Sequence, residues 1–348
     1  MSENPFVLFY GEHNISPVHQ DISNFNIHLQ RRGNLYRLLG LPTVFFRNRM
    51  VLEVGPGGGY NSLAMFMWGA TMDFVEPNPT AQNELKNLLQ TYNIPDSHWR
   101  LFPKIVEEFE PDRFYDLVIA EGFLPGLFER SNVIPKLKNL VQPGGVIVVT
   151  CVDVLSLFFE TLKRAVAFRL VRQVSGFSEK VRLLASAFDS HLKALKYSSR
   201  SIEDWVIDTF LNPATFGKLF SFKECLLEFG DNFIFLSSSP LMITNLQWYK
   251  DYHFDVRSNA LNQYQMKKHV LLLWDLPESI RPVPENEKLE VLASEIRHHG
   301  MELERTGSDE FSVMNQLLPL LTQFKNASRD IDARIEKAID AAASLFTD

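Results

Sequence analysis

The stretch Arg49-Met50-Val51-Leu52-Glu53-Val54-Gly55-Pro56-Gly57-Gly58-Gly59-Tyr60-Asn61 decides the fold. Val51, Leu52 and Val54 supply the apolar side chains of a buried parallel strand that is covered on both faces. The glycines after them allow a sharp turn, and from Asn61 onward apolar residues recur at helical spacing. The stretch therefore predicts a strand, a glycine-rich turn and a helix, with a ligand at the carboxyl end of the strand.

Two acidic residues indicate which ligand this turn binds. Glu53 lies where a dinucleotide's pyrophosphate would rest and would repel it, and Tyr60 stands where the dinucleotide fingerprint needs its third glycine. Glu76 closes the next predicted strand, where a carboxylate can accept hydrogen bonds from both ribose hydroxyls. The pair favours a nucleoside that carries positive charge. The alternative for the glycines is an ordinary strand-to-helix turn without a ligand.

Four motifs in order resemble the class I S-adenosylmethionine-dependent methyltransferases. They are Val51-Leu52-Glu53-Val54-Gly55-Pro56-Gly57-Gly58-Gly59, Val75-Glu76-Pro77-Asn78, Phe114-Tyr115-Asp116-Leu117-Val118-Ile119-Ala120-Glu121-Gly122 and Val141-Gln142-Pro143-Gly144-Gly145-Val146-Ile147-Val148-Val149. The resemblance covers residues 45 to 275 and implies a Rossmann-like, seven-stranded α/β sheet. It includes further strands at 232–236 and 269–274, the latter at an antiparallel edge.

The resemblance also implies S-adenosyl-L-methionine as cofactor and names the residues that hold it. The glycine loop would pass under the methionine part, Glu76 would hold the ribose, and Ala120 and Glu121 would help to place the amino-acid part. An acid that contacts adenine in many relatives has no clear counterpart, so a backbone contact from Ile105 or Val106 is expected instead. The cofactor-binding residues predicted in full are Glu53, Gly55, Gly57, Gly59, Glu76, Pro77, Ile105, Val106, Ala120, Glu121 and Arg32.

Candidate catalytic residues are Glu121 and His19. Glu121 is the acid that topology best places to face the sulfonium; its alternative is to cap a helix or pair with a surface cation. His19 belongs, with Tyr10, His13 and Arg32, to the segment ahead of the first strand, which covers the cofactor in proteins that this sequence resembles. The alternative is that these are surface polar groups.

Residues 154 to 200 are predicted to be helical and locally basic in an acidic protein. Against three acids they carry Lys163, Arg164, Arg169, Arg172, Lys180, Arg182, Lys193, Lys196 and Arg200. Arg164, Arg169 and Arg172 are candidates to attract an anionic acceptor, and Asp204, Trp205 and Asp208 to line its site. Solvated helical faces are the alternative for both groups.

Composition limits the remaining possibilities. The chain has 348 residues, 45% hydrophobic, and a net charge of −7, which argues against general nucleic-acid binding while leaving a local basic patch possible. The first residues lack a secretory signal and no apolar run is long enough to span a bilayer, so a cytoplasmic location is expected. Cys151 and Cys225 follow no metal-ligand spacing, and no metal is expected.

The predicted organisation has five parts: an N-terminal helical cap (1–44), a cofactor-binding core (45–153), a helical insertion that covers the acceptor (154–215), the rest of the core (216–276) and a helical C-terminal appendage (277–348) that could support a homo-oligomer. The predicted reaction is methyl transfer to an oxygen or nitrogen of a small-molecule acceptor. Two rival classes are an NAD(P)-dependent oxidoreductase, and a non-catalytic interaction protein with this fold.

Overall fold

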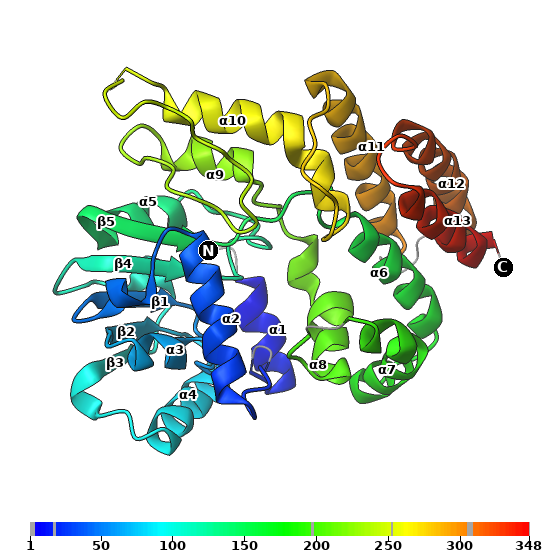
Figure 1. Cartoon of the computed structure of the whole chain (residues 1–348). Coiled ribbons are helices and arrows are strands. Elements are labelled where there is room, and N and C mark those ends of the chain that lie inside the picture. The colour runs from blue at the N-terminus through cyan, green and yellow to red at the C-terminus, as the bar shows by residue number, and fades with distance from the viewer. Residues whose placement is uncertain (1–3, 17–18, 196–197, 252, 305–308, 348) are drawn as a thin grey trace.

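Five parallel strands form a single sheet in the described part of the chain. The computed structural model describes residues 4–16, 19–195, 198–251, 253–304 and 309–347. The strands are β1 (Met50–Val54), β2 (Thr71–Val75), β3 (Trp99–Phe102), β4 (Tyr115–Ala120) and β5 (Val141–Val149), and they lie in the order β3-β2-β1-β4-β5 (Figure 1). This order, with helices between the strands, is that of a doubly wound α/β fold. The predicted Rossmann-like class is confirmed.

Helices flank the sheet and form a second body beside it. Those of the first part of the chain are α1 (Pro5–His13), α2 (Phe25–Leu38), α3 (Ser62–Met67), α4 (Pro79–Thr91) and α5 (Val133–Leu140). The later ones are α6 (Phe158–Val171), α7 (Phe177–Lys193), α8 (Ile202–Val206) with a π-helical turn (Ile207–Leu211), α9 (Phe222–Phe229), α10 (Val256–Lys267), α11 (Val283–Glu302), α12 (Glu310–Ala327) and α13 (Ala333–Thr347).

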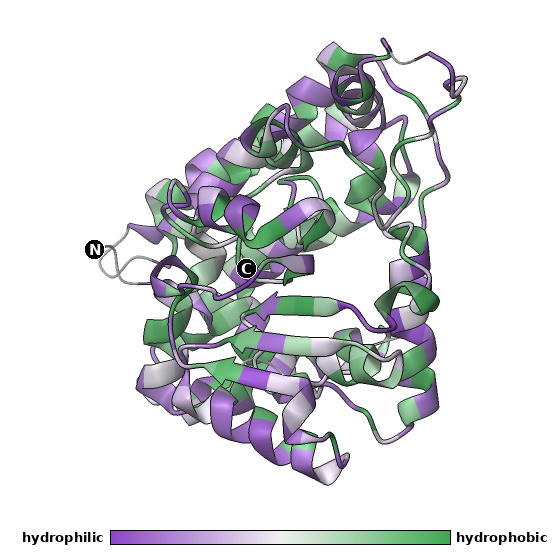
Figure 2. Ribbon diagram, turned by 90° about the vertical axis from the view of Figure 1, so that its left-hand side faces the viewer, coloured by the Kyte–Doolittle hydropathy of each residue, from purple (hydrophilic) through white to green (hydrophobic). Residues whose placement is uncertain are grey.

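Both faces of the sheet are buried, because successive residues of a strand point to opposite sides. Leu52 packs in a cluster with α5, whereas its neighbour Val51 packs in another cluster with α3 and α4. Val118 and Leu117 divide between the same two clusters. Figure 2 shows hydrophobic positions along the strands and mixed positions on the surrounding helices. The continuous apolar runs of the sequence thus reflect a sheet covered on both sides.

The prediction of seven strands is wrong for the described residues. The apolar run 269–274 continues from α10 as a 3-10 turn (Lys268–Leu272), where His269 accepts or donates a hydrogen bond at 2.8 Å with Ser279 Oγ. The run packs against the C-terminal helices rather than on the sheet edge. Residues 232–236 form no strand. Phe235 packs against Phe222, whereas Ile234 is 80% exposed, so the segment lacks the burial on both faces that a strand of this sheet has.

The predicted insertion and the predicted C-terminal appendage share one apolar core. Phe158 of α6 stacks on Phe324 of α12 with ring centroids 3.9 Å apart, and Leu289 and Ile296 of α11 belong to the same buried cluster. In Figure 1 this helical body lies beside the sheet, with α1 between the two. The amphipathic C-terminal helices therefore bury their apolar faces within this chain.

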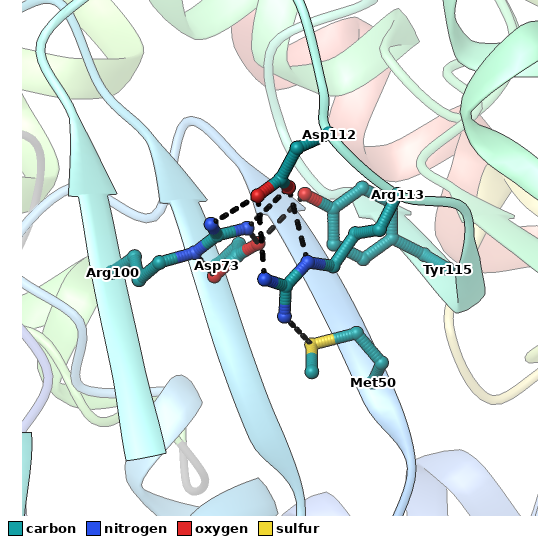
Figure 3. A network of polar contacts seen from close by, with 6 residues as sticks. All are labelled: Met50, Asp73, Arg100, Asp112, Arg113 and Tyr115. Carbon is teal, nitrogen blue, oxygen red and sulfur yellow. Dashed lines mark hydrogen bonds and ion pairs between the residues drawn. The ribbon is translucent and has the colours of Figure 1, made fainter. Parts of the chain in front are cut away.

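A buried polar network ties three strands together on one side of the sheet (Figure 3). Asp73 of β2 is 1% exposed and accepts two hydrogen bonds from the Arg100 guanidinium, at 2.9 and 2.5 Å, and one from the Tyr115 hydroxyl at 2.7 Å. The same guanidinium also binds Asp112, whose side chain is 59% exposed. Burial and charge pairing make Asp73 the costlier group to remove.

We therefore expect Asp73→Ala to lower the free energy of unfolding by about 2 to 3 kcal/mol, because it leaves the buried Tyr115 hydroxyl without its acceptor and Arg100 with Asp112 alone. Urea denaturation measures this change. Asp112→Ala is the matched control, since it removes a partner of the same arginine at an exposed position, and its effect should be much smaller. Equal losses in the two variants would show that the buried network does not stabilise the sheet.

Candidate functional site

The loop after β1 has a backbone shape that only glycine adopts readily. Gly55, Gly57 and Gly59 have φ values of 69°, 56° and 79°, all in the left-handed region. A Cβ on Gly59 would also lie 2.1 Å from Leu85 Cδ1. The loop can therefore turn tightly at the end of β1 and approach a ligand closely, as the sequence predicted.

A cavity of about 410 Å³ lies against this loop, at the carboxyl ends of β1, β2 and β4. Four acids and one arginine are among its described lining residues: Glu76, Glu107, Glu121, Asp208 and Arg200. Arg200 Nη1 donates to Asp208 Oδ2 at 2.9 Å, which engages its charge within the wall. An excess of carboxylates favours a cationic ligand over an anionic one.

Glu76 lies just past β2 with its carboxylate turned back toward the glycine loop. Its Oε2 accepts from Gly57 N at 3.1 Å, and its Oε1 accepts from Asn78 N at 2.8 Å. Burial raises the pKa of Glu76 to about 7, against the lowering effect of these two bonds. Each carboxylate oxygen can accept more than one hydrogen bond, so the pair can also accept from a ligand's hydroxyl groups.

Glu53 is buried within β1, two residues before the first glycine of the turn, and does not line the cavity. Its Oε2 accepts a hydrogen bond from Ser62 Oγ at 2.5 Å. Burial raises its pKa to about 7, and the negative charges of Glu121 and Glu76 act in the same direction. Glu53 therefore influences a ligand through its charge rather than by contact.

A buried ion pair joins α2 to the end of β4. The Arg32 guanidinium donates to Glu121 Oε2 at 3.0 Å and Oε1 at 2.8 Å, and the Tyr36 hydroxyl donates to Oε1 at 3.0 Å. Burial alone would raise the pKa of Glu121, but Arg32 holds it below its ordinary value. Glu121 thus lines the cavity as an ionised carboxylate with a buried cation as its partner. Arg32 reaches the cavity only through this pair.

The other predicted cofactor residues divide between the cavity wall and its surroundings. Pro77, Ile105 and Val106 line the cavity, together with Gly55 and Gly57. Ala120 and Gly59 do not, because Ala120 is fully buried in the sheet and Gly59 faces Leu85. Their roles in binding stay predictions.

His19 lies beyond the cavity lining, near its Tyr60 side. The two rings stand 5.7 Å apart, His19 Nε2 is 3.3 Å from Glu84 Oε1, and Nδ1 is 3.8 Å from Asp204 Oδ1. The His19 side chain is 45% exposed. Its catalytic role stays a prediction, and the observed contacts are those of a surface histidine between two acids.

Helix α1 forms a wall of the cavity that sequence reasoning found only in part. Tyr10 was a candidate, and its hydroxyl donates to Asp208 Oδ1 at 2.9 Å and accepts from Asn212 Nδ2 at 3.1 Å. Asn4, Phe6 and Val7, which also line the cavity, were missed because this segment shows no clear period. A local signal was present: Asn4 caps the helix by accepting from Phe6 N at 3.0 Å, and Pro5 occupies the first helical position.

The three arginines predicted to attract an acceptor are paired with acids of the C-terminal segment. Arg164 binds Glu304 through two hydrogen bonds, and Arg169 and Arg172 both bind Glu310 of α12. None of the three lines the cavity at the glycine loop. Lys196, part of the same basic segment, lies outside the described residues.

The residues predicted to line the acceptor site, Asp204, Trp205 and Asp208, lie at different places. Asp208 lines the cavity at the glycine loop and also a second cavity of about 340 Å³. Trp205 lines only the second cavity, with Lys163 Nζ 5.0 Å from its ring centroid. Ser201 caps their helix by accepting from Asp204 N at 3.0 Å, as the sequence predicted. Asp208 is therefore the group that the two cavities share.

Comparisons with known proteins give only partial structural similarity. No family model matches the chain, and neither does any curated protein. Among solved structures, PKMT2 from Rickettsia typhi is 15% identical with a TM-score of 0.46, covering 68% of this chain and 49% of that one. The glycopeptide N-methyltransferase MtfA, complexed with S-adenosyl-L-methionine, is 17% identical with a TM-score of 0.28, covering 31% of this chain and 50% of that one.

The [4+2]-cyclase SpnF is 16% identical with a TM-score of 0.31, and the match covers 35% of this chain and 44% of that one. This chain thus matches about half the length of each of these three proteins.

The described residues contain neither a membrane-spanning helix nor a cluster of metal ligands. None of their helices is long and apolar enough to cross a membrane. They also contain no group of three or more His, Cys, Asp or Glu residues arranged to hold a metal ion.

The raised pKa of Glu53 makes the stability of the ligand-free protein depend on pH. Below the ordinary pKa of 4.5, the carboxyl is protonated in both the folded and the unfolded chain. As the pH rises toward 7 the unfolded chain releases this proton first, so the free energy of unfolding falls, by up to roughly 3 kcal/mol for such a group. Glu76 contributes with the same sign.

We expect the parent protein to lose stability between pH 5 and pH 8, and Glu53→Gln to lose clearly less, because the amide does not titrate and still accepts a hydrogen bond from Ser62. Urea denaturation without ligand at several pH values tests this. Glu108→Gln, at an exposed position, should follow the parent. A Glu53→Gln curve parallel to that of the parent would contradict the assignment.

Proposed function

We propose that this protein is an S-adenosyl-L-methionine-dependent methyltransferase. The observation that carries the proposal is the buried Glu76 carboxylate, held by the glycine loop at the wall of a cavity rich in acids. A ribose needs paired acceptors for its hydroxyls, and a sulfonium ligand needs negative surroundings. Both requirements are met in one cavity at the carboxyl edge of a parallel sheet, where such folds bind ligands.

The residues present fit the proposed cofactor. Gly55 and Gly57 line the cavity with left-handed backbone, so no Cβ fills the space beside the loop. We propose that Glu76 binds the ribose, that Ile105 and Val106 lie against the adenine, and that Glu121 faces the amino-acid part. Glu53 adds negative charge from behind the loop.

The cofactor, when bound, supplies a methyl group on an activated sulfonium. The protein's part is then to align the acceptor and to exclude water. Helix α1 contributes to both tasks, because Phe6 and Val7 line the cavity with apolar surface. Because Glu121 is fixed by Arg32 and Tyr36, we assign it a binding role and expect proton removal, where the acceptor requires it, to fall to another group.

We further propose that the acceptor is a small molecule methylated on oxygen or nitrogen, with the helices of residues 154–215 as its cover. The prediction of an anionic acceptor rested on three arginines that pair with Glu304 and Glu310, so those pairs would have to open before the arginines could bind an anion.

The cofactor assignment predicts that Glu76→Ala weakens binding of S-adenosyl-L-methionine by about 2 to 3 kcal/mol, since charge-assisted hydrogen bonds to the ribose are lost. Titration calorimetry measures it, with circular dichroism to confirm that the variant is folded. Glu108→Ala removes a nearby acid that does not line the cavity and should bind as the parent does. Unchanged affinity in folded Glu76→Ala would mean that the ribose is held elsewhere.

The oxidoreductase alternative makes the opposite prediction for ligand choice. We expect S-adenosyl-L-methionine to raise the melting temperature of the parent protein and NAD to leave it unchanged, because the acidic cavity repels a pyrophosphate. Thermal shift measurements with each compound, together with mass spectrometry of any ligand retained on purification, decide between them. Stabilisation by NAD alone would reverse the assignment, and stabilisation by neither would favour a non-catalytic interaction protein.

A further inference from the structure

The second cavity is built by parts of the chain outside the sheet. Its described walls include Glu160 of α6, Trp205 of α8 and Gly300 of α11, so the C-terminal segment completes it. Asp208 lines both this cavity and the cavity at the glycine loop, so the two spaces meet at this side chain. Its volume of about 340 Å³ is in the range of small-molecule sites.

The arginines in this cavity are engaged with the protein. Arg164 donates from Nε and Nη2 to Glu304 at 2.8 and 3.1 Å, and from Nη1 to the Thr209 carbonyl at 2.9 Å. Arg297 Nη2 donates to the Gly217 carbonyl at 3.0 Å. An anionic ligand would have to displace these bonds in a buried setting, which is costly.

One carboxylate oxygen of this wall, in contrast, has no hydrogen-bond donor among the described residues. Glu160 Oε1 accepts from Lys163 Nζ, whereas Glu160 Oε2 is buried and has no hydrogen-bond partner among the described residues. A buried carboxylate oxygen without a donor is unfavourable, and a ligand N–H group would satisfy it. Leu157, Trp205 and Met301 supply apolar surface beside it.

Building on the proposed function, we infer that the second cavity binds the methyl acceptor and that this acceptor is a small amine with an apolar body. Its ammonium group donates to Glu160 on entry. The amine nitrogen then loses a proton to solvent water, since both oxygens of Asp208 already accept hydrogen bonds from Tyr10 and Arg200. The nitrogen lone pair forms the bond to the methyl carbon while the sulfur–carbon bond breaks, and its electron pair stays on sulfur.

Three probes that share a phenyl ring test this inference: phenethylamine, 2-phenylethanol and 3-phenylpropanoate. With S-adenosylhomocysteine present, calorimetry should show the amine binding about tenfold more tightly than the alcohol, and the carboxylate binding weakest. Glu160→Gln should remove most of the preference for the amine. Glu179→Gln, at an exposed position on α7, is the matched control and should keep it.

A second variant tests the place of binding. A Cβ on Gly300 would lie 3.3 Å from Thr161 Cγ2, so Gly300→Leu should fill the cavity, weaken the amine at least tenfold and leave cofactor affinity unchanged. Tighter binding of the carboxylate, or an unchanged preference in Glu160→Gln, would overturn the inference while cofactor binding persists. A parent protein that binds no S-adenosyl-L-methionine would instead overturn the proposed function.

Discussion

Carboxylates gather at the carboxyl ends of three neighbouring strands, and the structure depends on how their charge is balanced. Glu53 lies in β1, Glu76 follows β2 and Glu121 follows β4, and all three are largely buried. Desolvation disfavours each charge, and the charges of Glu121 and Glu76 further disfavour that of Glu53. Arg32 neutralises Glu121, whereas Glu53 and Glu76 have only neutral donors, which is why their pKa values rise to about 7.

This balance makes the N-terminal cap part of the site. Arg32 and Tyr36 are both on α2, so the helix that covers the edge of the sheet is held by the same carboxylate that lines the cavity. Removing the Arg32 side chain alone would leave Glu121 without its cation in a largely buried setting, at a cost of several kcal/mol. A cationic ligand would relieve the repulsion that remains between Glu53 and Glu76. The ligand-free protein is therefore expected to be less stable than the protein with such a ligand bound.

Local signals explain what could be predicted from the sequence. The turn after β1 could be predicted because its left-handed glycines follow directly from residue type, and Glu76 because a strand end has a defined place in the sheet. Residues 269–274 could not, since a short apolar run suits a buried strand and a buried helical turn equally. The pairing of Arg169 with Glu310 could not be predicted from the sequence either, because the two residues lie on different helices and meet only through tertiary packing.

The two cavities lie in differently packed parts of the molecule, one at the sheet and one in the helical body. At the glycine loop, backbone amides hold the buried Glu76 carboxylate in a fixed position. This part of the molecule therefore suits a ligand that is recognised by directed hydrogen bonds. The helical body is joined by stacked rings such as Phe158 and Phe324, and its cavity wall comes from segments far apart in the sequence. Asp208 stands where these two parts meet, held by Tyr10 of the cap and by Arg200. A change in the helical body can therefore alter the second cavity without moving the glycine loop. On the proposed function, this separates the choice of acceptor from the binding of the cofactor.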